Sequence, residues 1–363
     1  MKYMQDKTLG INLAAPDFEV ETPCFIIIES AVQYNLKRAA EFAGGVNRLV
    51  PHVKTHRSPW ITKYLVENGV KAFKAATPRE VEMVLNSGSP EVIWAYPTSN
   101  PAAISRVLRV AASHPQSIVC GLVDNDIGLS VWTELLTKQP LNNVTLRVDL
   151  DPGLGRTGLP ISDIAIELAE KVAQTGRFAG WHIYDGHLKD LDLSVREAQF
   201  LNLKDEVDQL FDSANRRGLT LDVIGGGSYT YPFWARHTEA RVSPGSWTFS
   251  SCQHHTDLSD QGWEVGAYVL ATVLSKRDGT VTLDAGSKAV APDITMTKRY
   301  TGVNEILDIK EEHSVVAVSD ENVGDHVALV PRHACTTTYL YRKALVLSIN
   351  GEWEWREQLG CER

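Results

Sequence analysis

The stretch VTLRVDLDPGLGRTGLPISDIAIELAEKVAQTGRFAGWHIY, residues 144–184, contains one complete strand–helix–strand repeat. Its start, Val144–Leu150, is rich in β-branched and apolar residues and favours a buried strand. Ile161–Gln174 then carries apolar residues at helical spacing, and Phe178–Tyr184 is a second strand-like run. This order predicts a βαβ unit, in which the two strands run parallel.

The same alternation of short apolar runs and amphipathic helices, such as Ser30–Phe42, extends from Pro23 to about Gly227. We expect eight strands there: Cys24–Ile28, Arg48–Val53, Ala72–Ala75, Glu91–Tyr96, Ser117–Val123, Val144–Leu150, Phe178–Tyr184 and Leu221–Ile224. Eight repeats within roughly 200 residues are typical of a closed parallel barrel. The sequence therefore predicts an α/β protein with a (β/α)8 barrel of the TIM type.

Beyond Gly227 the helical periodicity largely disappears. Strand-like runs separated by turns predict an antiparallel β domain, with strands at Gly262–Lys276, Thr280–Asp284, Ser314–Val318, His326–Val330 and Tyr339–Asn350. We place the barrel at residues 23–244, and the β domain at residues 1–22 together with 245–363.

Composition excludes several classes of protein. The 363 residues are 43% hydrophobic and 22% charged, which is a globular profile. Because 45 Asp and Glu outnumber 36 Lys and Arg, the net charge of −9 argues against nucleic acid or anionic membranes as partners. We find neither a signal peptide nor a membrane span, and five widely spaced cysteines indicate reduced thiols. We therefore expect a cytoplasmic protein.

Polar residues gather after several of the predicted strands, where the reactive groups of parallel barrels lie. Lys54, in PHVKTH (51–56), follows the second strand. Partial loss of hydration there would lower the pKa of its amine and leave some of it nucleophilic toward an aldehyde. The alternative is an ordinary surface lysine at a strand end.

Three consecutive glycines, Gly225–Gly227, follow the last predicted barrel strand, with Ser228 and Thr230 beyond them. Their backbone N–H groups would suit a phosphate, although a tight turn explains the glycines equally well. An amine and a phosphate-binding loop in one barrel favour pyridoxal 5′-phosphate, which needs both.

Arg147 lies inside an otherwise apolar strand, so its permanently charged guanidinium needs a partner. That partner is either the pyridine nitrogen of the cofactor or, as an alternative, Asp149 or Asp151 in an internal ion pair.

His333 and Cys335 follow the strand predicted at His326–Val330. On an extended chain, residues i and i+2 point to the same side, so an imidazole and a thiolate could bind one zinc-like cation. The alternative is a buried cysteine beside a capping histidine. His254 and His255 have no acidic or thiol companion in sequence and are interpreted as a loop pair.

Five stretches together resemble the family of D-threonine aldolases and D-serine dehydratases: PHVKTH (51–56), DPGLGRTG (151–158), GGGSYTY (225–231), PGSW (244–247) and HAC (333–335). The resemblance covers about Thr22 to Tyr341, with the motifs in the family's order. It implies a fold-type III pyridoxal-phosphate lyase with an alanine-racemase-like barrel. It also implies a homodimer that acts on β-hydroxy D-amino acids with the help of a divalent metal.

The resemblance also assigns roles. Lys54 would bind the cofactor covalently and act as the base at Cα, and Tyr184 would line the pocket near the ring. Arg147 would face the pyridine nitrogen. The phosphate or the ring would be contacted by Gly226, Gly227, Ser228, Gly245 and Ser246.

His333 and Cys335 would bind zinc, manganese or magnesium, and Asp320 would orient the metal or its water. A histidine of the family's pattern is replaced here by Asn322. The metal would act as a Lewis acid on the β-hydroxyl of the substrate.

The reaction is expected to be a dehydration, because Cys335 matches the dehydratases where the aldolases carry Asp. D-serine or D-3-hydroxyaspartate would then give a keto acid and ammonia. One alternative is retro-aldol cleavage to glycine and an aldehyde. Another is an amino-acid racemase with a tyrosine as second base, for which Tyr268, Tyr300, Tyr339 and Tyr341 are available. A non-catalytic carrier of pyridoxal phosphate is the last alternative.

Overall fold

The computed structural model describes residues 3–6, 11–14, 16, 18–317 and 320–363, which form two compact units. The barrel unit comprises residues 38–54 and 59–245, and the β unit comprises the described residues within 1–37, 55–58 and 246–362. Each of the two units combines segments that are far apart in the sequence. No helix among the described residues has the length and apolar character needed to cross a membrane.

The barrel unit is built on a parallel sheet with the strand order β11-β10-β9-β7-β6-β5-β4. In chain order the strands are β4 (Ala72–Ala75), β5 (Glu91–Trp94), β6 (Ile118–Val123), β7 (Val144–Asp151), β9 (Phe178–Ile183), β10 (Val223–Gly225) and β11 (Arg241–Val242). The short β8 (Leu159–Pro160) pairs with β7.

An extended segment completes the ring of strands. Leu49 bridges to Val242 of β11, and His52 bridges to Lys74 of β4, both in parallel orientation. The Val50 N–H donates to the Val242 carbonyl at 2.8 Å, and the Lys74 N–H donates to the Pro51 carbonyl at 2.9 Å. Residues 49–52 therefore connect the two edges of the sheet and close the barrel.

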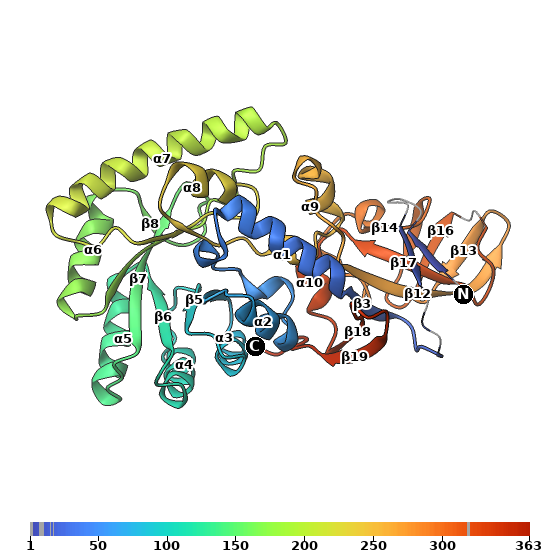
Figure 1. Ribbon diagram of the computed structural model, residues 1–363, viewed down its shortest axis with the longest axis horizontal. Coiled ribbons are helices and arrows are strands. Elements are labelled where there is room, and N and C mark those ends of the chain that lie inside the picture. Colours follow the sequence, from blue (N-terminus) through green and yellow to red (C-terminus); the bar gives the residue numbers. More distant parts are fainter. Residues whose placement is uncertain (1–2, 7–10, 15, 17, 318–319) are drawn as a thin grey trace. The chain divides into compact units, whose positions relative to one another are not determined.

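Helices surround these strands: α2 (Pro59–Glu67), α3 (Pro78–Asn86), α4 (Pro101–Ser113), α5 (Asp126–Lys138), α6 (Asp163–Gln174), α7 (Leu193–Arg216) and α8 (Tyr231–His237). Figure 1 shows α4, α5 and α6 flanking β5, β6 and β7. Side-chain oxygens of Thr77, Asn100, Asn125 and Asp192 accept N–H groups of the first turns of α3, α4, α5 and α7. Such N-caps fix where these helices begin.

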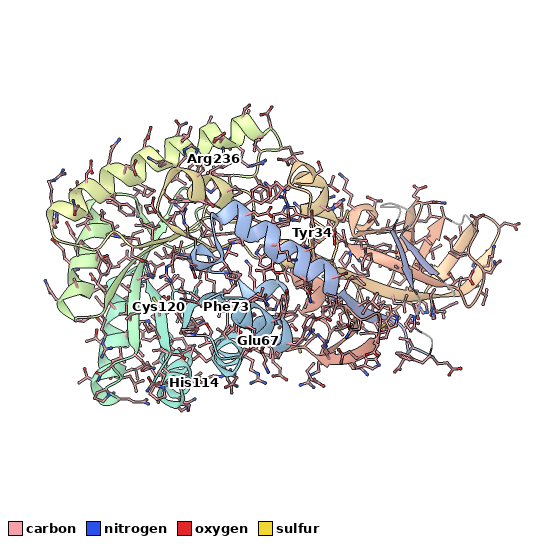
Figure 2. All side chains as sticks on the ribbon, in the orientation of Figure 1. Tyr34, Glu67, Phe73, His114, Cys120 and Arg236 are labelled. Atoms are coloured by element: carbon pink, nitrogen blue, oxygen red, sulfur yellow. The ribbon has the colours of Figure 1, made fainter. Side chains whose placement is uncertain are left out.

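Apolar side chains from several strands fill the inside of the barrel. The buried cluster consists of Val50, Ala72, Ile93, Cys120, Leu122 and Ile224. Figure 2 labels Cys120 among the side chains of the parallel strands, where burial raises the pKa of its thiol. The inside of the barrel is thus a packed core, as in other barrels of this kind, and chemistry is left to its rim.

The β unit contains a nine-stranded sheet with the order β15-β16-β13-β12-β3-β18-β19, to which β17 and β14 are attached. Its strands are β3 (Cys24–Ile28), β12 (Ala267–Arg277), β13 (Thr280–Leu283), β14 (Tyr300–Thr301), β15 (Ile306–Ile309), β16 (Ser314–Ala317), β17 (His326–Pro331), β18 (Lys343–Leu347) and β19 (Trp353–Glu357). A separate antiparallel pair joins β1 (Tyr3–Asp6) to β2 (Ile11–Ala14).

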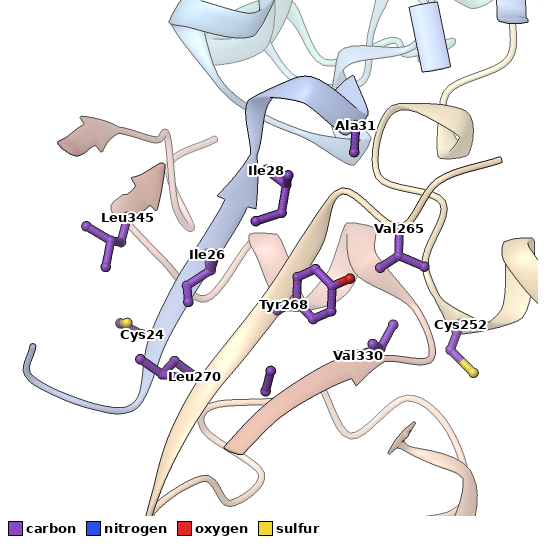
Figure 3. Packing of buried hydrophobic residues seen from close by; sticks show 11 residues of the cluster. Cys24, Ile26, Ile28, Ala31, Cys252, Val265, Tyr268, Leu270, Val330 and Leu345 are labelled. Carbon is purple, nitrogen blue, oxygen red and sulfur yellow. The ribbon is translucent and has the colours of Figure 1, made fainter. Parts of the chain in front are cut away.

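The core of the β unit is formed by β3, β12, β17 and β18. Figure 3 shows Ile26 and Ile28 of β3 close to Tyr268 and Leu270 of β12, with Leu345 of β18 on the other side. All five residues of β3 are buried. Helix α1 (Glu29–Ala43) follows β3 directly.

Two sequence predictions about the barrel are wrong. Cys24–Ile28 is not its first strand, because β3 pairs antiparallel with β12 and parallel with β18 in the β unit. Arg48–Val53 is not one continuous strand either, since short 3-10 helices at Val46–Arg48 and Val53–Thr55 flank the extended residues. The ring of eight is completed instead by β11.

Sequence patterns missed these features for physical reasons. An uninterrupted apolar run such as CFIII suits any fully buried strand, whichever sheet contains it. The strand β11 is only two residues long, too short to show a period. The compact units divide between Gly245 and Ser246, and residues 23–37 lie in the β unit.

Candidate active site

A cavity of about 380 Å³ opens in the barrel unit. Its walls come from positions at or just after the carboxyl ends of the strands, including Ala95 and Pro97 after β5 and Thr157 after β7. Five basic side chains line it: His52, Lys54, Lys74, Arg156 and His182. A concave site with so many basic groups suits an anionic ligand.

Tyr184, which follows β9, presents its ring to three of these cations. The Lys54 Nζ lies 5.7 Å from the ring centroid, the Lys74 Nζ 5.3 Å and the Arg156 Cζ 4.8 Å. A Cβ on Gly186 would lie 2.5 Å from the Tyr184 Cζ, so only glycine allows the ring this position. The motif Tyr184-Asp185-Gly186 therefore places an aromatic wall next to both amines.

Lys54 lies in the short 3-10 helix Val53–Thr55, immediately after the extended segment that closes the barrel. Its backbone N–H is 3.4 Å from the His52 Nδ1. Burial, together with Lys54 and Lys74, holds the pKa of His52 well below its ordinary value, so this ring is a neutral acceptor. The Lys54 side chain itself lines the cavity, with its Nζ near the Tyr184 ring.

Lys74 was not identified from the sequence. It lies on β4, is 2% exposed, and its Nζ is 2.9 Å from the Ser243 Oγ. Burial above all, and then the positive charge of Lys54, lower the pKa of Lys74 to about 7. The sequence feature that could have identified Lys74 is a charged residue inside the apolar strand Ala72–Ala75. The same feature singled out Arg147.

A buried histidine–carboxylate pair forms another part of the wall. The His182 Nδ1 is 2.6 Å from the Asp149 Oδ1, and the Thr157 hydroxyl donates to the other carboxylate oxygen at 3.0 Å. Burial, and then Lys74, lower the pKa of His182. Its Nε2 has no hydrogen-bond partner among the described residues, so it is available to a ligand in the cavity.

The glycine loop is engaged by the protein itself. Gly226 has a φ of 83° and donates its N–H to the Ile183 carbonyl at 3.2 Å. The Gly227 N–H donates to the Asp185 Oδ1 at 2.9 Å. A Cβ on Gly226 would lie 2.8 Å from Trp234, so this glycine is required by a tight turn. The amides of Gly226 and Gly227 are therefore not open donors for a phosphate.

Asp185 is the acceptor that organises this loop. Besides Gly227, its buried carboxylate accepts from the Thr230 hydroxyl at 2.7 Å and from the Trp234 indole at 2.8 Å. Burial raises the pKa of Asp185. Ser228 comes directly after this turn. Gly245 comes two residues after Ser243, whose hydroxyl donates to the Gly226 carbonyl at 3.0 Å.

Arg147 points away from the residues that line the cavity. Its Nη2 pairs with the Asp222 carboxylate at 2.5 Å, and its Nη1 donates to the backbone carbonyls of Trp181 and Asp222. Asp222 immediately precedes β10, at the amino end of that strand. The structure thus provides an ion pair of the kind considered for Arg147, with Asp222 in place of Asp149 or Asp151.

In the β unit, His333 and Cys335 do come together. Helix α10 (Ala334–Thr338) begins immediately after His333, so the extended chain expected at Cys335 is wrong. The two side chains nevertheless lie close enough to interact. The influence of Cys335, and then that of Asp293, outweighs partial burial and raises the pKa of His333 to about 9. The Thr55 Oγ1 lies 3.2 Å from the Cys335 Sγ.

Asp293 was missed from the sequence, because the dipeptide Pro292-Asp293 carries only a turn signal. Its Oδ2 is 2.6 Å from the His333 Nδ1 and accepts from the Thr336 hydroxyl at 3.1 Å. A carboxylate on Nδ1 is the usual way to leave Nε2 as the metal-binding nitrogen. Among the residues that the structure describes, no group of three or more His, Cys, Asp or Glu side chains could hold a metal.

Asp320 lies apart from this pair. It is exposed in the turn before β17, whereas His333 follows the other end of that strand. The six residues of β17 span roughly 20 Å. Asn322 donates its side-chain N–H to the Asp320 carbonyl in the same turn. The fold therefore gives no support to a role for Asp320 at the metal.

Comparisons with known proteins place this geometry in context. Residues 266–347 match the family model described as "Putative serine dehydratase domain". A 3-hydroxy-D-aspartate aldolase of Paracoccus denitrificans is 27% identical over 342 residues, which cover 88% of this chain and 86% of the relative. A D-threo-3-hydroxyaspartate dehydratase of a Delftia species is 21% identical over 94% of this chain and 97% of its own length.

Among solved structures, a D-threonine aldolase from Filomicrobium marinum superimposes with a TM-score of 0.84 at 24% identity, covering 95% of this chain and 97% of that one. The fold predicted from the sequence, an alanine-racemase-like barrel with a separate antiparallel β domain, is confirmed. The resemblance to the family of D-threonine aldolases and D-serine dehydratases is also confirmed. Its relatives are named for aldolase and dehydratase activities, both lyase reactions, and the expectation of an enzyme is confirmed with them.

Proposed function

We propose that this chain is a lyase that uses pyridoxal 5′-phosphate and a divalent metal on β-hydroxy D-amino acids. The observation that carries this proposal is the cavity of the barrel unit, in which the Lys54 amine lies beside the Tyr184 ring. A cofactor with an aldehyde needs an accessible amine to react with, and its aromatic ring needs a flat side chain to pack against.

The residues present fit the ring and the aldehyde of this cofactor. Lys54 supplies the amine, Tyr184 supplies an aromatic surface, and the unpartnered Nε2 of buried His182 supplies a polar contact. When bound, pyridoxal phosphate supplies an electron sink for the pair of electrons left at Cα. Lys54 would hold the cofactor and, once its amine is displaced by the substrate, take the proton from Cα.

The residues that we propose for the phosphate of the cofactor differ from those that the resemblance implies. Since the amides of Gly226 and Gly227 are engaged within the fold, they are not proposed as phosphate ligands, and the resemblance leaves Ser228 of the barrel unit as the residue that we propose for the phosphate. Arg147 is omitted from the cofactor contacts because Asp222 engages its guanidinium. Arg156 and the ammonium form of Lys74 give this cavity positive charge, which a phosphorylated ligand needs.

The donor set of His333 and Cys335 fits a zinc-like metal that also binds water or substrate. Imidazole and thiol are ligands of this type, and Asp293 holds the imidazole in the required orientation. Two protein ligands leave coordination positions for a substrate hydroxyl. A metal here would stabilise negative charge on that oxygen when its bond to carbon or hydrogen breaks.

We favour dehydration of D-serine or D-3-hydroxyaspartate, because Cys335 matches the dehydratases. Retro-aldol cleavage is the second candidate, and it is supported by the relative and the solved structure that are named as aldolases. The homodimer expected from the resemblance is retained as part of the proposal.

Product analysis tests this proposal and separates the two reactions. The protein reconstituted with pyridoxal phosphate is incubated with D-serine, D-threonine and D-3-hydroxyaspartate, with and without EDTA. Ammonia with a keto acid identifies a dehydratase, whereas glycine with an aldehyde identifies an aldolase. We expect EDTA to remove most of the turnover and added metal to restore it. Turnover of none of the three substrates contradicts the proposal.

Lys54→Met provides the matched test of the cofactor. Reduction of the wild-type holoprotein with borohydride should attach the pyridoxyl group to Lys54, and this label should be absent from that site in the variant. Lys63, which is exposed on α2, offers a control: Lys63→Met should label as the wild type does. Attachment of the cofactor to another lysine of the wild-type protein would remove Lys54 from the scheme.

The structure adds little support to the alternatives. Tyr268 and Tyr300 are buried, the Tyr341 hydroxyl donates to the Ala289 carbonyl at 2.8 Å, and the Tyr339 ring lies under the Arg57 guanidinium. These contacts make the tyrosines poor second bases for a racemase. A racemase should in addition keep its turnover in EDTA. A carrier would have no use for the pair His333 and Cys335.

A further inference from the structure

The cavity of the barrel unit contains two lysines, and the proposed function uses only one. The Lys54 Nζ and the Lys74 Nζ lie at similar distances from the Tyr184 ring, 5.7 and 5.3 Å from its centroid. They come from different segments, the 3-10 helix Val53–Thr55 and strand β4. Of the two lysines, only Lys54 lies within a sequence motif that resembles the family, PHVKTH (51–56).

Lys74 is held firmly in this place. Its aliphatic chain is buried in the barrel, and its Nζ donates to the Ser243 Oγ at 2.9 Å. The Ser243 hydroxyl in turn donates to the Gly226 carbonyl at 3.0 Å. One N–H of Lys74 is thus used for orientation, and the rest of the amine belongs to the cavity wall.

Among the residues that the structure describes, Lys74 forms no hydrogen bond or ion pair with a carboxylate, although Asp149 and Asp185 lie near enough to act on its charge. Asp149 is already engaged by His182 and Thr157, and Asp185 by the glycine loop. Like charges face the amine as well. The titratable and charged groups around it are His52, Lys54, Asp149, Arg156, His182 and Asp185.

We propose that Lys74 is a second catalytic residue of this site, an amine that exchanges a proton with the β-hydroxyl of the substrate while Lys54 serves the cofactor and Cα. This inference rests on the proposed function. In the amine form, Lys74 takes the hydroxyl proton: the O–H bond breaks, an N–H bond forms, and the electron pair stays on oxygen. In the ammonium form, it returns a proton to that oxygen as the C–O bond breaks and water leaves.

Burial and its cationic neighbours suit Lys74 to this work. Because they lower the pKa of Lys74 to about 7, both the amine and the ammonium are well populated near neutral pH. General acid–base groups are most effective when their pKa lies close to the working pH. His182 is less suited to donate, since burial lowers its pKa and keeps its ring neutral.

The test compares the reconstituted wild-type holoenzyme with Lys74→Met, Lys74→Arg and Lys71→Met. Lys71 is exposed and lies three residues earlier, next to the start of β4, which makes Lys71→Met the matched control. The measurements are kcat/KM from pH 5.5 to 9 and the visible absorbance of the bound cofactor.

We expect the wild-type profile to have a limb near pH 7. Lys74→Met should bind the cofactor, lose that limb and fall about 10²- to 10⁴-fold in kcat/KM. Lys74→Arg keeps the charge but cannot release a proton, so it should also lose the limb. Lys71→Met should match the wild type.

Two outcomes overturn the inference. The first is a Lys74→Met variant with wild-type turnover and pH profile, which leaves the proposed function intact. The second is a Lys74→Arg variant that keeps the wild-type kcat/KM and pH profile, because Lys74 would then contribute only its positive charge. A wild-type protein that binds no pyridoxal phosphate contradicts the proposed function itself, and the inference with it.

If Lys74→Met fails to fold, a titration of the wild-type holoenzyme still tests the inference. In protein labelled with ¹³C-lysine, the Lys74 Cε signal, assigned by its loss in Lys74→Arg, should titrate with a midpoint near pH 7. A midpoint at the ordinary value for lysine, about 10.4, overturns the inference.

Discussion

The Asp149 carboxylate lies 2.6 Å from the Nδ1 of His182, inside the barrel unit and next to its cavity. Both side chains are buried, and the Thr157 hydroxyl holds the second carboxylate oxygen. Since a carboxylate only accepts, it fixes the proton of the neutral imidazole on Nδ1. The lone pair of Nε2 is thereby kept available to a ligand in the cavity.

Asp149→Asn should therefore reduce activity without unfolding the protein. The amide removes the charge from a hydrogen bond worth about 1.5–3 kcal/mol, which corresponds to a roughly ten- to hundredfold loss in kcat/KM. Steady-state kinetics with the best substrate would measure this loss. Thr157→Val keeps the carboxylate on His182 and should have a smaller effect. Equal activity of Asp149→Asn and the wild type would show that the orientation of His182 is unimportant.

His333→Ala should abolish turnover while the cofactor absorbance is retained, because His333 belongs to the proposed metal site only. Metal analysis of the purified variant should find the bound metal lost. Asp293→Asn should weaken metal affinity about 10- to 100-fold, since Asp293 orients the His333 ring through Nδ1. Full activity of His333→Ala would contradict the metal assignment.

Acid should destabilise the β unit through two buried histidines. Burial lowers the pKa of both His56 and His254 to about 3. In the unfolded chain each takes up a proton near pH 6.5, whereas in the folded chain neither does until about pH 3. The free energy of unfolding should therefore fall as the pH drops below 6.5, by up to about 1.4 kcal/mol per pH unit for each histidine.

Urea unfolding at pH 7.5 and pH 5, followed by tryptophan fluorescence, would measure this loss. His254→Gln should make the difference in the unfolding midpoint between the two pH values smaller. His326 is exposed at the start of β17, so His326→Gln should leave the difference unchanged. An identical pH dependence in His254→Gln and the wild type would argue against the buried neutral form of His254.

Arg147→Met should destabilise the barrel unit while cofactor binding is preserved. The variant removes the guanidinium donor from the Trp181 carbonyl and from the Asp222 carboxylate, and hydrogen bonds of a charged group are worth about 1.5–3 kcal/mol. Denaturant unfolding gives the stability, and the visible absorbance of the holoprotein reports the cofactor. Arg109→Met, on the exposed side of α4, is the control.

A changed absorbance spectrum with unchanged stability would point the other way. It would return Arg147 to the pyridine nitrogen, as the resemblance first suggested.

The barrel strands were predictable from sequence where their context is regular. Ala72–Ala75 was predicted with the observed bounds, and Val144–Leu150 and Phe178–Tyr184 each differ from the observed strand by one residue at the carboxyl end. Each is a short apolar run followed by an amphipathic helix, and local periodicity is enough to recognise this pattern. The helix near Ile161–Gln174 begins two residues later, at Asp163, after the Ser162 N-cap position.

The residues of the candidate site also fall into two groups, those that sequence motifs indicate and those that only the fold reveals. Lys54, Tyr184, His333 and Cys335 stand in motifs, so they could be selected from the sequence and their neighbours in the chain. Asp293 and Ser243 carry no such signal, because their importance lies in a contact with a residue at least 40 positions away. Lys74 had a local signal, but only the fold reveals that it shares a cavity with Lys54.

The sequence by itself determined the succession of strands and helices, the closed barrel and the motifs that resemble a family, because these depend on residues close together in the chain. Only the tertiary structure decided that Cys24–Ile28 joins the β unit and that the glycine-loop amides are engaged. It also decided that Asp222 neutralises Arg147. A buried strand, donor or charge takes its partner from whichever segment the fold brings near, and that partner has no fixed distance along the chain.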